Sequence, residues 1–565
     1  MRNLLLTTAL VLSAAAAQGQ TTVSLDKAGT LAEKISSAEK YNITDLKISG
    51  PINGTDIILL RDMAGQNQDN NVSDGKLEDL DLTNATIVKG GEPYYVSYSG
   101  SKDIEYYTND NEMGNAMFFN CGKLKKVKLP TSVTAIGDSC FYKCNALEDI
   151  TIPETVKEIR SYALSYTALP RFEFAKGMTI ASHVLSGCSE MTEIIIPDDV
   201  TEISEEAFSG TGITSIKLPS KLKTIGSEAF SGSMLTSLEC PEDLISIKDN
   251  AFARCKQLAE VKFNSKLEEI GKSAFTYCSL TEADVPNSVK TMGGAFGVCD
   301  KLTKAHLPEG LTTIEGSMFT RCPKLEEVNI PEGVTSIGSM AFQNNSSLKD
   351  VKLPEGLTTI GKSAFKDCSS FTEIKLPSTV ESIGVSCFDG CENATTIQLS
   401  PALKEIPRDA FGFCSSVTEI DIPEGVETIG DMAFMYCESI TKLTLPSTLT
   451  SMSSSVFGGE EALEEIYCNA VTPPTCGRSV FADVPEDCVL YVPKDSKDAY
   501  ANADTWSYFT NIKENGTTGI NNSLKSTGNA YETERYNIAG QNVGRSYNGL
   551  QIIKYSDGRA VKVAK

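Results

Sequence analysis

The sequence contains one string that matches a phosphate-binding motif. Gly356-Leu-Thr-Thr-Ile-Gly361-Lys362-Ser363 fits the pattern G-x-x-x-x-G-K-[ST]. A phosphate loop needs a strand before it and a helix that begins after it, so that backbone N–H groups surround the phosphate. Here the same phrase recurs one repeat earlier, from Gly333 to Gly338. We therefore interpret the string as part of a repeated turn and expect no nucleotide cofactor.

The residues that usually perform catalysis or bind metals are scarce or scattered. The only histidines, His183 and His306, lie too far apart along a repeating chain to share one site. Two close cysteine pairs occur, 140 with 144 and 387 with 391, and neither has a histidine nearby. The oxygen-rich segment 69–75 has its glycine too late for a calcium loop, so a solvated turn is favoured. We expect no enzyme activity, metal or cofactor.

Most of the cysteines recur at one position, three residues after a recurring aromatic residue. They are Cys121, Cys144, Cys188, Cys255, Cys278, Cys299, Cys322, Cys368, Cys391, Cys414 and Cys437. Thr167, Thr211, Ser233 and Asn345 take the same position in other copies. Small side chains at one inward corner predict a ladder of buried thiols. Cys476 and Cys488 lie off this ladder and are the better candidates for a disulfide.

A phrase of 22 or 23 residues repeats along the chain, in its clearest form from Leu325 to Phe342. A short alternating strand precedes a proline, and an aromatic residue follows. The aromatic position holds Phe118, Phe141, Phe208, Phe230, Phe252, Phe275, Phe296, Phe319, Phe342, Phe365, Phe388, Phe411, Phe434 and Phe457, with Leu164 and Leu185 in two weaker copies. One copy cannot bury its own apolar face, so the copies must stack into a solenoid of about 16 turns.

This repeat resembles that of the BspA-like leucine-rich-repeat family, the Treponema-type class of bacterial surface proteins, over residues 118–467. The resemblance implies an α/β-type solenoid, a right-handed superhelix of short strands. It also implies secretion or surface display and adhesion to host or bacterial proteins, without identifying the ligand.

The flanking regions predict the remaining organisation. Residues 1–20 have the pattern of a secretory signal peptide, with Arg2 before a short apolar run. Residues 21–117 are expected to form an N-terminal cap, and residues 468–513 a C-terminal cap in which Trp506 covers the core. Residues 514–529 have a linker composition, and the strand-rich module 530–565 resembles a short sorting domain of type IX secretion substrates. That resemblance implies the outer surface of a Gram-negative bacterium.

The charge of the chain excludes some partners. The formal net charge is −23 and the pI is near 4.7, which disfavours binding to nucleic acid or to anionic lipid. No later apolar stretch is long enough for a membrane span. The expected partners are therefore extracellular or cell-surface proteins.

Two surfaces are candidates for binding. An outward column of the strands is acidic and includes Glu260, Glu282, Glu327, Asp350, Glu373 and Glu419. A tyrosine cluster precedes the first full repeat and includes Tyr94, Tyr95, Tyr98, Tyr106 and Tyr107. The tyrosines could form an adhesive loop or could pack the N-terminal cap.

The sequence favours an exported solenoid that displays an extended surface for protein binding and adhesion. One alternative is a structural component of the cell envelope or matrix without a specific ligand. An exported enzyme or glycan-binding protein is disfavoured, because the strand columns lack clustered catalytic groups and exposed aromatic platforms.

Overall fold

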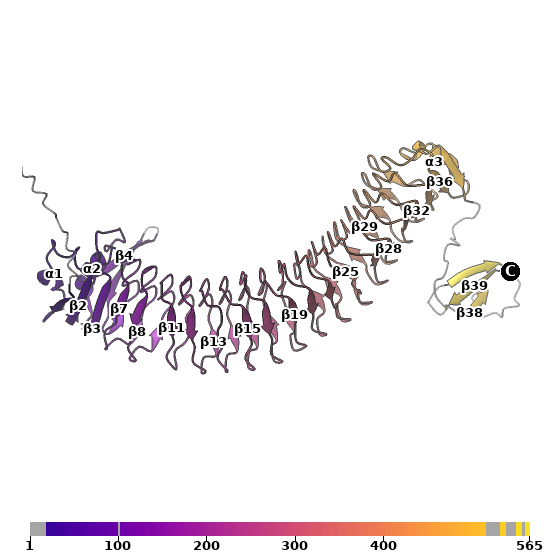
Figure 1. Cartoon of the computed structure of the whole chain (residues 1–565). Helices are drawn as coiled ribbons and strands as arrows, with labels where there is room; N and C mark the ends of the chain where they lie inside the picture. Colours follow the sequence, from indigo (N-terminus) through magenta and orange to yellow (C-terminus); the bar gives the residue numbers. More distant parts are fainter. Residues whose placement is uncertain (1–18, 100–101, 516–531, 538–549, 556–559, 565) are drawn as a thin grey trace, which may run out of the picture.

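A computed structural model describes residues 19–99, 102–515, 532–537, 550–555 and 560–564 (Figure 1). The chain winds into a β-solenoid of stacked parallel turns, and the stack bends into an arc. This confirms the predicted repeat solenoid. Almost all of the predicted signal peptide and linker lie outside the described residues.

One column of parallel strands runs along the whole arc. Most of its strands are three residues long with the middle residue buried, as in Lys304–His306, which explains the alternating sequence pattern. The column contains β1 (Thr21–Ser24), β2 (Asp45–Ile52), β3 (Asp79–Ile87), β7 (Lys126–Lys128), β9 (Asp149–Thr151), β11 (Arg171–Glu173), β12 (Glu193–Ile195), β15 (Ser237–Glu239), β17 (Glu260–Lys262), β19 (Glu282–Asp284), β21 (Lys304–His306), β23 (Glu327–Val328), β26 (Glu373–Lys375), β28 (Thr396–Gln398), β30 (Glu419–Asp421), β32 (Lys442–Leu445), β34 (Glu465–Cys468), β36 (Val489–Val492) and β37 (Asn511–Glu514).

A second column of two-residue strands follows the proline of each repeat. Its strands pair in parallel with the next turn, as Ile337 does with Ile360. The column contains β6 (Glu112–Met113), β8 (Ala135–Ile136), β10 (Glu158–Ile159), β13 (Glu202–Ile203), β14 (Thr224–Ile225), β16 (Ser246–Ile247), β18 (Glu269–Ile270), β20 (Thr291–Met292), β22 (Thr313–Ile314), β24 (Ser336–Ile337), β25 (Thr359–Ile360), β27 (Ser382–Ile383), β29 (Glu405–Ile406), β31 (Thr428–Ile429), β33 (Ser451–Met452) and β35 (Thr475–Cys476).

The solenoid is longer than the repeat pattern predicts, with about 21 turns rather than about 16. At the N-terminal end, β1, β2 and β3 join β7 and β9 in one parallel sheet. At the C-terminal end, β36 and β37 extend the sheet that contains β34. Both predicted caps therefore continue the strand column. The sequence before residue 112 lacks the proline and aromatic spacing, so counting repeats missed its turns. Residues 468–513 keep part of the pattern, because Phe481 stacks on Phe457 and Pro493 follows β36.

Helices occur only near the two ends of the described solenoid, and the repeats between them consist of short strands and turns, consistent with the predicted solenoid. The helices are α1 (Leu31–Lys34), α2 (Gly54–Met63), α3 (Lys497–Ala501) and the 3-10 helix η1 (Trp506–Tyr508). Within the repeats, the residues two before and two after the core aromatic position have positive φ, with Gly294 as the exception; Ser317 (59°) and Arg321 (55°) around Phe319 are an example. We call these the left-handed positions. They prevent a helix, because left-handed backbone cannot continue a right-handed helix.

The core consists of two ladders that run along the arc. Rings of neighbouring turns stack, for example Phe230 on Phe252 with centroids 5.2 Å apart and planes 2° apart. Beside them run the thiols, which are buried as the sequence predicted. A typical thiol, Cys322, lies with its Sγ 3.2 Å from the carbonyl oxygen of Phe296 in the preceding turn. Trp506 is fully buried and packs edge-on against Phe481, which closes the last turn.

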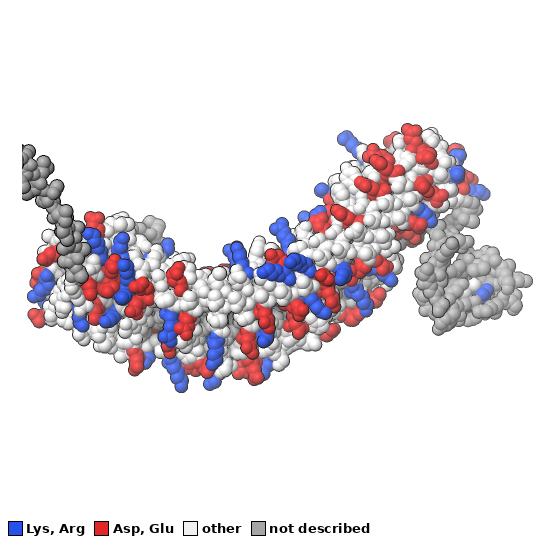
Figure 2. All heavy atoms as spheres, in the orientation of Figure 1, with Lys and Arg blue, Asp and Glu red and all other residues white. Residues whose placement is uncertain are grey.

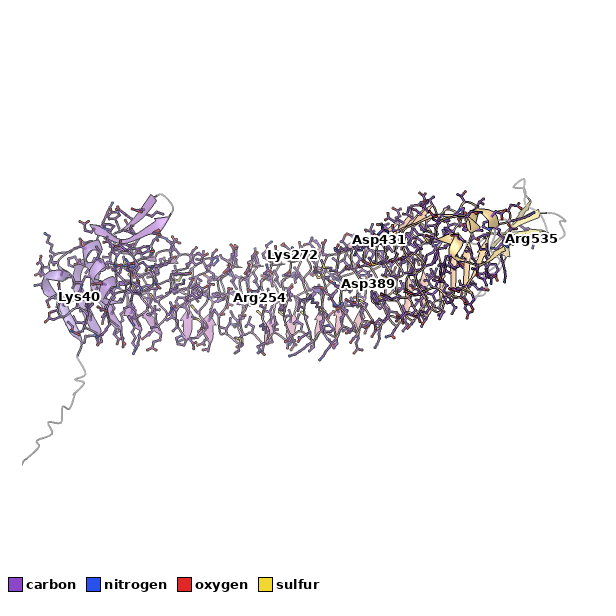
Figure 3. The ribbon with its side chains drawn as sticks, turned by 90° about the horizontal axis from the view of Figure 1, so that it is seen from above. Lys40, Arg254, Lys272, Asp389, Asp431 and Arg535 are labelled. Atoms are coloured by element: carbon purple, nitrogen blue, oxygen red, sulfur yellow. The ribbon has the colours of Figure 1, made fainter. Side chains whose placement is uncertain are left out.

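Two smaller elements stand outside the strand columns. The antiparallel hairpin of β4 (Gly90–Ser99) and β5 (Lys102–Thr108) projects on the inner side of the arc (Figure 1). The C-terminal module is an antiparallel sheet of β38 (Glu532–Asn537), β39 (Leu550–Tyr555) and β40 (Ala560–Ala564), which agrees with its strand-rich sequence. Figure 3 shows the solenoid from above, with Arg254 and Asp389 labelled along it.

Candidate functional site

The residues of the predicted acidic column lie on the solvent side of the first strand column, except Asp350, which lies where no strand forms. Glu327 and Glu419 each have 68% of their side-chain surface exposed. Each has a lysine of a neighbouring strand close by, with Lys304 Nζ 3.1 Å from Glu327 and Lys442 Nζ 4.0 Å from Glu419. Such exposed ion pairs contribute little to stability. Figure 2 shows acidic and basic side chains interspersed over the visible face, so any binding to these strands would be polar and distributed.

Asp350 is more firmly held than the glutamates of this column. Its carboxylate accepts hydrogen bonds from the backbone N–H groups of Thr372 (2.7 Å) and Glu373 (3.2 Å), and from the Thr372 hydroxyl (2.5 Å). Partial burial acts to raise its pKa, but the bonds from Thr372 outweigh this and lower the pKa of Asp350. Residues 349–353 form no strand, so the carboxylate of Asp350 accepts backbone N–H groups of the next turn that a strand carbonyl would otherwise bind.

The tyrosine cluster divides into packed and exposed members. Tyr94 is 1% exposed and its hydroxyl donates to the Asn115 carbonyl at 2.7 Å. Tyr95 is 8% exposed and its ring lies between those of Tyr106 (5.5 Å) and Phe119 (5.4 Å). Burial raises the pKa of Tyr94 and of Tyr95. These rings therefore join the hairpin to the first turns.

Tyr107 and Tyr98 lie farther along the same hairpin. Tyr107 is 47% exposed, and its hydroxyl is bonded to the Glu105 carboxylate at 2.6 Å. Tyr98 lies in β4 opposite Asp103, and its side chain is outside the described atoms. The other tyrosine of β5, Tyr106, packs against the core. Tyr107 therefore has the more exposed side chain of the two.

Arg61 anchors this region and was not identified from the sequence. It is fully buried, and its guanidinium donates to the carbonyls of Ala116 (3.2 Å), Met117 (3.1 Å) and Asn67 (3.3 Å). It also lies 4.8 Å from the centre of the Tyr95 ring. One cation thus connects α2, the hairpin and the first repeat. A single arginine within an amphipathic segment gave no sequence signal for this role.

Two polar residues occupy the cysteine position and bond to the preceding turn. Asn345 accepts the backbone N–H of Cys322 at 2.8 Å, and Glu460 accepts that of Cys437 at 2.9 Å. Burial raises the pKa of Glu460 to about 8, against an ordinary value of 4.5. The sequence pattern contained Asn345 in this position but not Glu460.

The residues with potential for chemistry remain apart. His306 is exposed on β21, whereas His183 lies between turns near Glu206. The phosphate-motif string forms β25 and a turn in which Ser363 has a φ of 53°, and no helix begins there. Among the described residues, no cluster of three or more histidine, cysteine, aspartate or glutamate side chains could hold a metal ion.

Cys476 and Cys488 do not form the predicted disulfide in the structure. Both are free thiols, and the Sγ of Cys476 lies 3.6 Å from the Pro474 carbonyl oxygen. Burial raises the pKa of each thiol to about 12. Both side chains therefore pack into the last turns.

The stacked parallel strands, the core ladders and the 22- to 23-residue period define a leucine-rich-repeat solenoid. The model of the family described as BspA type leucine rich repeat region, in six copies, matches residues 76–191, 178–294, 293–369 and 358–484. The chain belongs to this family. Leucine-rich-repeat proteins are generally non-enzymatic scaffolds that bind proteins.

Solved structures with similar repeats come from several bacteria. A leucine-rich repeat protein from Bacteroides ovatus is 24% identical, with 74% of this chain and 90% of that chain covered and a TM-score of 0.47. A leucine rich cell surface protein from Faecalibacterium prausnitzii is 24% identical, with coverages of 66% and 86% and a TM-score of 0.29. The pneumococcal vaccine antigen PcpA is 16% identical, with coverages of 75% and 88% and a TM-score of 0.28.

These structural similarities carry no argument about function. No curated protein matches the chain. In the part of the chain that the structure describes, none of the helices has the length and apolar character needed to cross a bilayer.

Proposed function

We propose that this protein is exported and displays its solenoid as an extended surface for adhesion to extracellular or cell-surface proteins. The observation that carries the proposal is the long, exposed, polar strand face of a member of the BspA-type family. Glu327, Glu373 and Glu419 repeat along this face with their side chains in solvent. A distributed set of polar contacts on a long arc suits a large protein partner better than a small substrate.

The test is binding of the chain from Thr21 onward to a panel of extracellular-matrix and bacterial-surface proteins by biolayer interferometry. The double variant Glu327→Lys and Glu373→Lys reverses two charges on the first strand column. We expect a saturable interaction that this variant weakens about tenfold, because charged groups at an interface set partner choice and association rate.

The control reverses the same number of charges elsewhere. Glu381→Lys with Glu405→Lys changes two exposed glutamates at or near the second strand column, β27 and β29. Equal loss in both double variants would mean that net charge, and not the first column, controls binding. Silence of the wild-type chain across the panel would instead favour a structural component without a specific ligand.

A further inference from the structure

Three tyrosines form an angular, partly exposed surface beside the hairpin. The ring of Tyr142 lies 6.1 Å from that of Tyr162 and 5.5 Å from that of Tyr166. The planes of the Tyr162 and Tyr166 rings make angles of 73° and 79° with the plane of the Tyr142 ring. Tyr162 and Tyr166 are 37% and 44% exposed. We call these three residues the aromatic corner.

The backbone of the aromatic corner is unfavourable for such large side chains. Tyr162 (φ 59°) and Tyr166 (φ 56°) occupy the two left-handed positions of one turn. The position of Tyr166 is filled by Gly187, Gly210 and Gly232 in the next three turns. Glycine adopts this conformation without steric cost, whereas a tyrosine does not. Tyr277, Phe413 and Tyr436 occupy the same position in other turns, so the left-handed backbone alone does not mark this site. What distinguishes the corner is that three tyrosine rings from two turns meet there.

The surrounding residues hold the rings in place. A Cβ on Gly187 would lie 2.4 Å from a carbon of the Tyr166 ring, so only glycine lets that ring lie against the next turn. On the other side, Tyr162 stacks on His183 with centroids 4.1 Å apart and planes 22° apart. Tyr142 in turn stacks on Phe119 at 5.2 Å, which links the corner to the hairpin through Tyr95. The rings are therefore fixed before any ligand arrives.

The charges around the corner favour a positively charged ligand. Glu205 is exposed, and Glu206 lies with its Oε1 3.2 Å from His183 Nε2. Burial, and then the carboxylate of Glu206, raises the pKa of Tyr162, which reflects how near that carboxylate lies. The ammonium of Lys143 already lies 5.3 Å from the centre of the Tyr142 ring. The chain as a whole carries a net charge of −23.

We propose that the aromatic corner binds a lysine or arginine side chain presented by a partner protein. Aromatic faces attract cations through their ring quadrupoles, and neighbouring carboxylates add to that attraction. A glycan would also stack on tyrosine, but it would gain nothing from the net negative surroundings. The inference deepens the proposed protein-binding function and rests on it for the identity of the partner as a protein.

The test measures the affinity of fluorescent hexalysine and hexaarginine peptides for the chain from Thr21 onward by fluorescence anisotropy. Tyr166→Gly should weaken binding about tenfold. The same variant should keep or raise the thermal midpoint, because glycine is the native residue of the following turns at this position. Lys143→Met should tighten binding, since it removes the ammonium that competes for the Tyr142 ring.

The matched control is Tyr277→Gly. Tyr277 has the same left-handed position (φ 63°) and is 46% exposed, but it lies outside the aromatic corner. We expect this variant to bind the peptides as the wild type does. The inference would be overturned if the two glycine variants lost the same affinity for the peptides. It would also be overturned if fully acetylated hexalysine bound as tightly as hexalysine. Binding of neutral oligosaccharides, lost in Tyr166→Gly, together with no peptide binding would assign the corner to glycans instead.

The panel experiment separates this inference from the proposed function. A panel protein whose binding is unchanged by Tyr166→Gly and by excess hexalysine would support the proposed function and overturn the role of the corner. Peptide binding that depends on Tyr166, with no protein bound across the panel, would support the corner and overturn the adhesion proposal.

Discussion

At the scale of single residues, one inward position of the repeat holds a thiol in most turns and a hydroxyl, an amide or a carboxyl in others. Most turns place a thiol there, and Cys437 points its Sγ at the carbonyl oxygen of Phe411, 3.2 Å away. Asn345 and Glu460 instead reach back to a backbone N–H of the preceding turn. Glu460 is 0% exposed, and its Oε2 is among the buried polar atoms of the described residues without a hydrogen-bond partner. Burial of this kind favours the protonated carboxyl.

The substitution Glu460→Gln is expected to remove a pH dependence of stability. The pKa of Glu460 is about 8 in the folded chain and near 4.5 when exposed, so folding is favoured by protonation. This stabilisation is complete below about pH 4.5 and is lost as the pH rises through 8. At pH 8 the variant should be more stable than the wild type by up to about 4 kcal/mol. Urea unfolding of both chains at pH 5 and pH 8 checks this, and a wild-type stability equal at both pH values would contradict it.

At the scale of the element, each turn depends on its two neighbours. Phe319 is fully buried and stacks between Phe296 at 5.9 Å and Phe342 at 5.6 Å. Its backbone N–H also bonds to Ala341 of the next turn at 2.8 Å. Because each turn contacts only its two neighbours, a destabilised turn should affect the stability of adjacent turns alone. The turns on its two sides should then unfold independently of each other.

Phe319→Ala is expected to cost about 3–5 kcal/mol, because it leaves a cavity between two stacked rings. Phe319→Leu is the matched control, since Leu164 and Leu185 fill this position in native turns and are fully buried. Its cost should be about 1–2 kcal/mol. Hydrogen exchange should show faster opening in residues 296–342 for the alanine variant alone. Uniform loss of protection along the whole arc would argue against nearest-neighbour cooperativity.

At the scale of the whole molecule, the terminal turns determine whether the solenoid is stable as a monomer. The last turns carry Trp506, whose indole N–H donates to the Pro474 carbonyl at 2.8 Å and whose ring contacts Phe481 at 5.3 Å. Without this lid, the rings of the previous turns and the edge of β34 would face water. Exposed edge strands with apolar cores favour association between copies.

A chain that ends at Cys468 is therefore expected to aggregate, whereas one that ends at Asn515 should remain monomeric with the thermal midpoint of the full chain. The shorter chain loses β36, β37 and Trp506, and the longer one retains them all. Size-exclusion chromatography with light scattering distinguishes the two. A monomeric, fully cooperative chain ending at Cys468 would show that the C-terminal turns do not act as a lid.

Structural features that repeat along the chain could be predicted from the sequence, whereas features that occur once could not. The period, the buried rings at Phe319 and its equivalents, and the thiol ladder were readable because stacking makes every copy face the same environment. The turns at 21–117 were missed as turns, because strands such as β2 join the same column without the repeat phrase. The turn that leads to β36 was missed because Phe481 and Pro493 carry the phrase at a wider spacing. The burial of Arg61 and Glu460 was also unpredictable, since each occurs once.

The sequence by itself determined the solenoid and its family, because these follow from spacing along the chain. Only the tertiary structure decided which side chains of different turns meet. Tyr142, Tyr162 and Tyr166 come together because stacking brings residues about one repeat apart into contact and left-handed backbone turns two of the rings outward. Backbone conformation and contact between turns leave no mark in composition or period, so the aromatic corner could be found only in three dimensions.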